Sequence, residues 1–184
     1  MLFMKIRIIK DDNPLMRERS KEVPLPLSKE NKALLDAMLE YLKMSQDEEY
    51  AEKHHIRAGV GLAAIQVKRL ERMFVIYYEN GEGQVVQYQL VNPKIIESSV
   101  KQCALQNGEG CLSVDKVHQG FVHRHYKIRL KAFDALQNKD IEISATGFDA
   151  VVLQHEYDHL DGIFFYDRID DAAPNKLHPN EELI

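Results

Sequence analysis

Residues 148–160 read FDAVVLQHEYDHL and constrain the fold more than any other stretch of the chain. Their apolar side chains are spread around most of the circumference of a helix, which is typical of a helix buried on nearly every side. Gly162 follows at a position suited to a helix C-cap. A helix of this kind needs other elements packed around it, so we expect it to lie at the centre of the fold.

The segments upstream of this helix have the period of β-strands. Residues 73–78 and 84–91 are rich in β-forming residues and are joined by residues 80–83, whose composition favours a hairpin turn. Apolar and polar residues alternate in residues 127–133, and the alternation resumes in residues 141–145. We therefore expect two pairs of antiparallel strands.

Another helix is predicted nearer the N-terminus. It starts after Ser28, a residue type favoured as N-cap, and leucine and methionine recur at helical spacing between residues 34 and 42. Residues 45–57 are acidic and then histidine-rich, which indicates an exposed extension that is helical in part. The predicted fold class is α+β, with mainly antiparallel β-sheets packed around the central helix and an amphipathic helix near the N-terminus.

Length and composition fit one domain, which we expect to span residues 1–184. A chain of 184 residues, 45% of them hydrophobic, buries a core without help from disulfides or metals, so any metal is expected to be functional. The net charge is -5 and the basic residues are scattered along the chain, which argues against nucleic acid as a partner.

Signals for membranes or secretion are not evident in the sequence. The first twelve residues, MLFMKIRIIKDD, lack the apolar core of a signal peptide, and no apolar stretch approaches the roughly 20 residues of a membrane helix. The two cysteines, Cys103 and Cys111, are too few for the disulfide framework of a small secreted protein. We expect a soluble cytoplasmic protein that does not bind membranes.

The central helix also carries reactive side chains. His155 and His159 are four residues apart, so they share a helix face and can bind one tetrahedral ion. Glu156 lies beside them and is placed to take a proton from a metal-bound water. The alternative is that these three residues merely satisfy one another. Polar side chains on an apolar helix are costly unless they are paired or bound to something, which favours the metal site.

The third ligand decides the class of such a site. A metzincin would have a histidine six residues after His159, but that residue is Phe165. A protease completed by glutamate would have to use Glu181 or Glu182, which lie in the last four residues. Both protease patterns therefore fit poorly, although an endopeptidase with an unrecognised third ligand stays open as an alternative.

Cys111, in the run GEGCLS at residues 108–113, is the better candidate for the third ligand. A thiolate between flexible glycines can approach a metal closely. We interpret Cys103 as a small buried hydrophobic residue. If it were a ligand as well, then Cys103, Cys111, His155 and His159 would form a closed structural zinc site with no room for water.

A third cluster, GVGLAAIQ at residues 59–66, is weak evidence on its own. Together, however, the three clusters closely resemble peptide deformylase, the enzyme family that removes the formyl group from the starting methionine of new bacterial proteins. The family motifs GxGLAAxQ, EGCLS and QHExDHxxG match residues 59–66, 109–113 and 154–162. The longer segment before residue 59 resembles the second type of bacterial deformylase, found in Gram-positive and mycoplasma-like enzymes.

This resemblance implies a metal and a reaction. Cys111, His155 and His159 would hold one divalent ion, which is Fe(II) in most family members and can be replaced by zinc, nickel or cobalt. Glu156 would act as general base on the metal-bound water, which attacks the formyl carbon and releases formate. The implied substrates are N-formylmethionyl nascent peptides, so the resemblance also implies transient contact with the ribosome.

The resemblance further implies roles for the first two motifs. The side-chain amide of Gln66 and the backbone N–H of Leu112 would stabilise the oxyanion that develops on the formyl group. Val60, Gly61 and Gly110 would contact the substrate, and Gly61 would let the chain pass close to it.

Other positions are implied to support the site. An apolar pocket around His155 and residues 151–152 would select methionine, while Arg124 and Asp158 match recurrent family residues that we expect to be supporting rather than catalytic. Ile65 stands where many members have proline, which puts the rigidity of that loop in question. Six histidines outside the motifs are expected to be surface or supporting groups: His54, His55, His118, His123, His125 and His178.

Overall fold

The computed structural model describes residues 6–184, so the first five residues of the N-terminal stretch discussed above lie outside it. Within it, five strands form one antiparallel sheet. They are β1 (Gly61–Ala63), β2 (Met73–Glu79), β3 (Val85–Ser98), β6 (Lys127–Asp134) and β7 (Lys139–Thr146). Their order across the sheet is β1-β2-β3-β6-β7.

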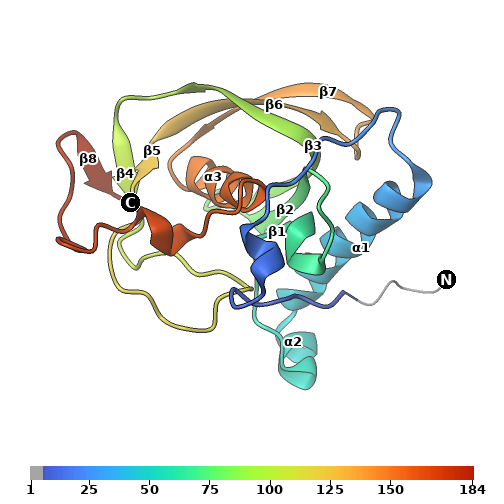
Figure 1. Cartoon of the computed structure of the whole chain (residues 1–184), viewed down its shortest axis with the longest axis horizontal. Coiled ribbons are helices and arrows are strands. Elements are labelled where there is room, and N and C mark those ends of the chain that lie inside the picture. Colours follow the sequence, from blue (N-terminus) through green and yellow to red (C-terminus); the bar gives the residue numbers. More distant parts are fainter. Residues whose placement is uncertain (1–5) are drawn as a thin grey trace.

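A smaller, three-stranded sheet lies at one end of the molecule, on the left in Figure 1. Its strands are β4 (Gln102–Ala104), β5 (Arg124–His125) and β8 (Glu181–Leu183), in the order β5-β4-β8. β4 pairs antiparallel with β5 and parallel with β8. The predicted α+β class with mainly antiparallel sheets is confirmed, and β4–β8 is the one parallel pair of strands among residues 6–184.

The three α-helices lie in the segments where helices were predicted, while the three short 3₁₀-helices were not predicted. The α-helices are α1 (Lys29–Ser45), α2 (Glu48–His54) and α3 (Phe148–Leu160), and short 3₁₀-helices are η1 (Pro14–Arg17), η2 (Ala64–Val67) and η3 (Phe165–Arg168). The hydroxyl of Ser28 caps α1 by accepting a hydrogen bond from the N–H of Asn31 at 3.1 Å. α2 has no buried residue, in line with an exposed extension. Within the described residues, every helix is too short or too polar to cross a membrane.

The large sheet packs a helix against each of its faces. Because successive side chains of a strand point to opposite faces, β2 contributes Phe74 and Ile76 to the core with α3 and Met73 and Val75 to the core with α1. Figure 1 shows α3 at the centre of the molecule, beneath the arch of β3, β6 and β7. Ten of the thirteen residues of α3 are buried, as its pattern predicts.

The end of α3 depends on a glycine. The C-cap is Asp161, one residue before the predicted position, and Gly162 follows with a φ of 71°. The N–H groups of Gly162 and Ile163 bond to the carbonyls of His159 and Asp158 at 3.2 and 3.0 Å, which is the Schellman pattern. A Cβ on Gly162 would also lie only 2.3 Å from the carbonyl oxygen of Arg17.

The predicted hairpins form, but one strand extends further than its pattern indicates. β2 and β3 pair from Met73–Val91 to Glu79–Val85. β3 then continues to Ser98 through a bulge at Asn92, whose φ is 50°, and beyond it pairs only with β6. The side chain of Asn92 holds the bend by bonding the N–H and the carbonyl of Val23 at 2.7 and 2.8 Å.

The end of α1 positions the first motif. The hydroxyl of Ser45 accepts a hydrogen bond from the N–H of Gly59 at 3.1 Å. The side-chain amide of Gln46 donates to the carbonyls of Gly59 and Tyr77 at 2.8 and 2.7 Å. These contacts hold the chain that leads into β1, so residues 59–66 lie against α3.

Candidate metal centre

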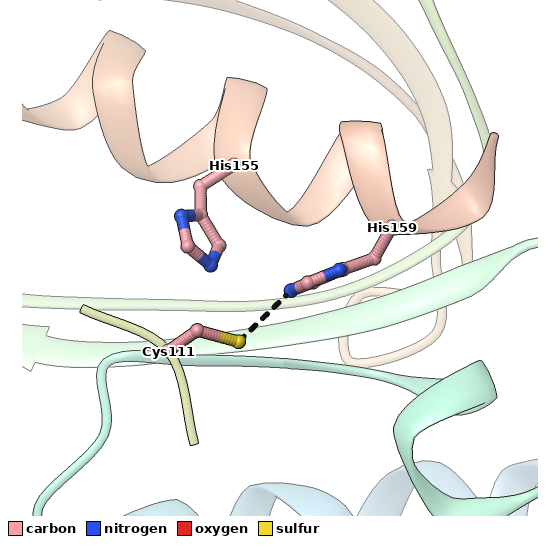
Figure 2. A group of neighbouring side chains, drawn as sticks. All are labelled: Cys111, His155 and His159. Carbon is pink, nitrogen blue, oxygen red and sulfur yellow. Dashed lines mark hydrogen bonds between the residues drawn. The ribbon is translucent and has the colours of Figure 1, made fainter. Parts of the chain in front are cut away.

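Three potential ligand atoms converge between α3 and the loop that contains the second motif. His155 and His159 project from one face of α3 toward Cys111, as Figure 2 shows. The sulfur of Cys111 lies 3.3 Å from Nε2 of His159, and one ligand atom of each of the three residues lies within 4.8 Å of the others. All three residues predicted as metal ligands from the sequence are therefore brought together.

The predicted oxyanion donor Gln66 lies in the same cluster. Its Oε1 accepts a hydrogen bond from the N–H of Ala63 at 2.8 Å, which fixes the orientation of the amide. Its Nε2 donates to the hydroxyl of Ser113 at 3.0 Å and lies 3.6 Å from the sulfur of Cys111. The N–H of Ser113 also points at this sulfur, at 3.4 Å. These contacts hold the sulfur of Cys111 in place beside the two histidines, and cysteine binds metals through this atom.

Arg57 fastens the loop that carries Cys111. Its Nη2 donates to the carbonyls of Cys111, Leu112 and Val114 at 2.9, 3.1 and 3.0 Å. The carbonyls are turned toward Arg57, and the N–H of Leu112 makes no hydrogen bond to any of residues 6–184. Arg57 was not predicted from the sequence, because a single arginine outside the three motifs has no pattern that marks it.

A buried network of charges orients His155. Its Nδ1 lies 2.8 Å from Oε2 of Glu109, and Glu109 receives two hydrogen bonds from Arg124, both at 2.8 Å. Arg124 is only 2% exposed and also donates to Asp158, which accepts a second hydrogen bond from Arg168. Burial raises the pKa of Glu109, but Arg124 and His155 outweigh this effect and bring it down to about 2. Glu109 is therefore an anion that holds His155 through Nδ1 and leaves Nε2 free for another partner.

The pKa values of the two histidines shift in opposite directions, and the reasons indicate that the cluster favours a positive charge. Burial lowers the pKa of His159 well below its usual value, so its ring is neutral. Burial also acts to lower the pKa of His155, yet hydrogen bonds to Cys111 and Glu109 outweigh it and raise that pKa well above the usual value. A buried sulfur and a buried carboxylate thus draw positive charge onto His155. Since one thiolate and two imidazoles are donors that transition metals favour, the residues present fit a divalent metal ion.

Glu156 follows His155 on α3 and lies beside the cluster. Its side chain is buried, and its Oε2 has no hydrogen-bond partner in the described part of the chain. Burial raises the pKa of Glu156 to about 7, against smaller opposing effects of His155 and Arg124. A carboxyl group with a pKa near neutrality can both accept and donate protons. Glu156 therefore has the properties of a general acid and base.

The cluster lies at the wall of a cavity of about 280 Å³. The predicted substrate residues Val60, Gly61 and Gly110 line this cavity. Its apolar wall comes from Leu105 and from the first turns of α3, namely Phe148, Val151 and Val152. The predicted location of an apolar pocket, near His155 and residues 151–152, therefore coincides with a real cavity beside the metal-binding cluster.

Cys103 lies outside this cluster. It is buried on β4, and the group formed by Cys111, His155 and His159 does not include it. Burial and the nearby carboxylates of Glu181 and Glu182 raise the pKa of Cys103 to about 11, so its thiol is neutral. The four-ligand closed zinc site therefore lacks one of its four ligands, and the interpretation of Cys103 as a buried hydrophobic residue agrees with its surroundings.

A thiolate, two imidazoles and a carboxyl that exchanges protons beside a substrate-sized cavity are the components of a metal-dependent hydrolase. Comparison with known proteins narrows this class. Residues 5–175 match the sequence model of the polypeptide deformylase family. The chain is 49% identical over 178 residues to a peptide deformylase of Macrococcus caseolyticus, with 96% of each chain covered. It is 44% identical over 173 residues to peptide deformylase 2 of Bacillus subtilis, with 94% of each covered.

The solved structures agree with these sequence matches. A probable peptide deformylase of Synechococcus phage S-SSM7 superposes with a TM-score of 0.72 and 32% identity, over 90% of this chain and all of that one. The chain thus belongs to the peptide deformylase family, whose enzymes depend on a metal and remove the N-formyl group from nascent polypeptides. The expected resemblance, including that to the second type, is confirmed.

Proposed function

We propose that Cys111, His155 and His159 hold one divalent ion, natively Fe(II), with zinc, nickel or cobalt as substitutes, and that this centre removes the formyl group from N-terminal formylmethionine. The observation that carries this proposal is the convergence of three ligand atoms beside the unpartnered Oε2 of Glu156, at the wall of a cavity. A divalent ion bound there would lower the pKa of water from 15.7 toward about 7 and would polarise a carbonyl group.

Glu156 moves the proton in this mechanism. Its Oε2 takes a proton from the attacking water and then delivers it to the departing amine, so that formate and a free N-terminus result. The support is the position of this buried oxygen, which has no partner among residues 6–184, and a pKa near 7 that allows both transfers. Glu109 keeps His155 in place from the opposite side.

Two donors stabilise the negative charge that develops on the formyl oxygen. The Nε2 of Gln66 is held within the cluster through the bond of its Oε1 to Ala63. The N–H of Leu112 is unused by the rest of the described chain, and Arg57 fixes the backbone around it. Removing one such donor from an oxyanion site costs about 3 to 4 kcal/mol of transition-state stabilisation.

The substrate lies in the cavity beside this centre. Val60, Gly61 and Gly110 contact the formylated peptide, and the apolar wall of Phe148, Val151 and Val152 receives the methionine side chain. Because the substrates are chains still being synthesised, we further propose a cytoplasmic protein in transient contact with the ribosome, with residues 1–184 acting as one catalytic domain. We propose no nucleic-acid or membrane partner.

The test measures formate release from an N-formylmethionyl peptide by anaerobically purified, Fe(II)-loaded protein. Glu156→Ala is prepared in parallel, and its metal content and circular dichroism are compared with those of the parent. We expect rapid release by the parent and a loss of roughly a hundred- to ten-thousandfold in a folded, metal-bearing variant. No release by a parent that holds its ion would contradict the proposal. Cleavage of internal peptide bonds by Cys111→Ala would instead support the endopeptidase alternative.

A further inference from the structure

His123, His178 and Glu181 form a second cluster of potential metal ligands, on the small sheet and apart from the Cys111 centre. One ligand atom of each residue lies within 4.8 Å of the others. His123 precedes β5, Glu181 begins β8, and His178 lies in the segment that leads into β8. The cluster therefore brings the segment around β8 into contact with the segment before β5.

His123 faces Glu181 through Nδ1, while Nε2 of His178 makes no hydrogen bond within the described part of the chain. Nδ1 of His123 lies 2.7 and 2.8 Å from the two carboxylate oxygens of Glu181. Nδ1 of His178 lies 2.9 Å from the amide oxygen of Gln102. An ion between Nδ1 of His123 and the carboxylate of Glu181 would take the place of the proton that these two groups share. His178 donates through Nδ1 to Gln102 and therefore carries its lone pair on Nε2. The two rings stack at 3.7 Å, so they lie directly beside each other.

His123 and Glu181 are both buried, and the charge of Glu181 needs a positive partner. The side chain of His123 is 8% exposed, and its Nε2 is buried without a hydrogen-bond partner in the described chain. The side chain of Glu181 is 0% exposed, and His123 is its only ion-pair partner among residues 6–184. A buried carboxylate is costly unless its charge is balanced. Neither lysine nor arginine does so here, which leaves the imidazole and whatever it binds.

We propose that His123, His178 and Glu181 bind a divalent transition-metal ion of the zinc class, which holds the C-terminal strand against the rest of the protein. Two imidazoles and one carboxylate form a ligand set that zinc uses. Side-chain rotations bring the ligand atoms from within 4.8 Å to the roughly 3.4 Å that separates neighbouring ligands around a tetrahedral zinc. His178 is exposed, so an ion reaches the site from solvent.

The position of the cluster gives the ion a structural role. β8 is three residues long and is held by its parallel pairing with β4. The N–H of His178 bonds Oε2 of Glu181 at 2.7 Å, so the segment folds back on itself where the ligands lie. An ion on this cluster ties β8 to the segment around His123. The role is independent of the Cys111 centre and of the proposed reaction.

Equilibrium dialysis of the full chain against zinc, followed by elemental analysis, tests the site. We expect two zinc ions per chain for the parent and one for His178→Ala, which removes an exposed side chain and leaves the fold intact. Cys111→Ala should also hold one, and the double variant none. His54→Ala is the matched control, because it removes an exposed histidine elsewhere, and it should hold two. A parent with one ion, or His178→Ala with two, would overturn the proposal.

Digestion by a serine carboxypeptidase gives a second measurement that does not depend on counting ions. Zinc at ten times its dissociation constant should slow removal of the last residues about tenfold in the parent, because the ion binds only the attached strand. His178→Ala and Glu181→Gln should show no protection, and Cys111→Ala should be protected like the parent. Equal protection of His178→Ala would assign the effect to another site and contradict the proposal that an ion on this cluster holds β8.

Discussion

The carboxylate of Glu156 occupies the space that a side chain on Gly61 would need. A Cβ at residue 61 would lie 2.3 Å from Oε1 and 2.6 Å from the carboxyl carbon of Glu156, well inside contact distance. Gly61 is an ordinary strand residue without a positive φ, so the approach of Glu156, and not the backbone conformation, requires glycine here. Gly61 of the first motif is therefore required, at least in part, to leave space for Glu156 of the third motif.

Gly61→Ala should consequently move Glu156 and lower activity. Displacement of a catalytic group by about 1 Å can cost roughly a hundredfold in rate. We expect kcat/KM for a formylmethionyl peptide to fall by about that factor, with metal content unchanged. Gly81→Ala is the control, because a Cβ there meets nothing within 4 Å, and it should keep full activity. Full activity in Gly61→Ala would show that Glu156 adapts without loss.

Glu156 should also make the metal-free protein less stable at high pH. Its pKa is about 7 in the fold, against an ordinary value of 4.5, because burial disfavours the charged form. Between these values the folded protein keeps a proton that the unfolded chain has released. The free energy of unfolding therefore falls as pH rises from about 4.5 to about 7 and is level above that range.

Glu156→Gln removes this titration and should stabilise the metal-free protein above neutrality. Urea unfolding should give a gain of about 3.5 kcal/mol at pH 8 and nearly none at pH 4, since the pKa falls from about 7 to 4.5 on unfolding and each pKa unit corresponds to about 1.4 kcal/mol. The same substitution abolishes the proposed proton transfer, so stability and activity should change in opposite directions. An equal effect at both pH values would mean that the charge of Glu156 is not the cause.

Glu109 should control metal affinity without touching the metal. Glu109→Gln keeps the shape of the side chain but removes the charge that balances Arg124 and orients His155. Loss of such a supporting carboxylate typically weakens metal binding by roughly 10- to 100-fold, which competition with a chelator can measure. Glu97→Gln is the matched control, because Glu97 also pairs with an arginine, Arg129, but at the surface. A similar loss in both variants would point to a general effect of charge.

The sequence predicted the elements whose patterns are long and local. The thirteen residues of α3 repeat their apolar pattern often enough to show both the helix and its burial, and the ligand spacing of His155 and His159 follows from that helix. The hairpin of β2 and β3 shows in its β-forming residues and its turn. Motifs placed Cys111 and Gln66 beside the histidines, although those residues are far apart along the chain.

What the sequence did not show depends on contacts between distant segments. β4 and β8 have three residues each, too few for a period, so their parallel pairing had no signal. The bulge at Asn92 is fixed by a bond to Val23 that no local pattern contains. The grouping of His123 with His178 likewise arises only once β8 is placed against β4, and the two were therefore expected to be ordinary surface or supporting residues.

Substitution of the two cysteines separates a catalytic centre from a closed structural one. Cys103 is buried on β4 with a neutral thiol, and it lies outside the cluster of Cys111, His155 and His159. Cys103→Ser should therefore cost about 1 to 3 kcal/mol of stability, because a buried hydroxyl replaces the thiol, while the metal stays bound. Cys111→Ser should lose the ion from the cluster. Cobalt substitution distinguishes the two, because a thiolate bound to cobalt absorbs strongly in the near ultraviolet. The band should persist in Cys103→Ser and vanish in Cys111→Ser; loss of the band in both would make Cys103 a ligand and restore the closed site.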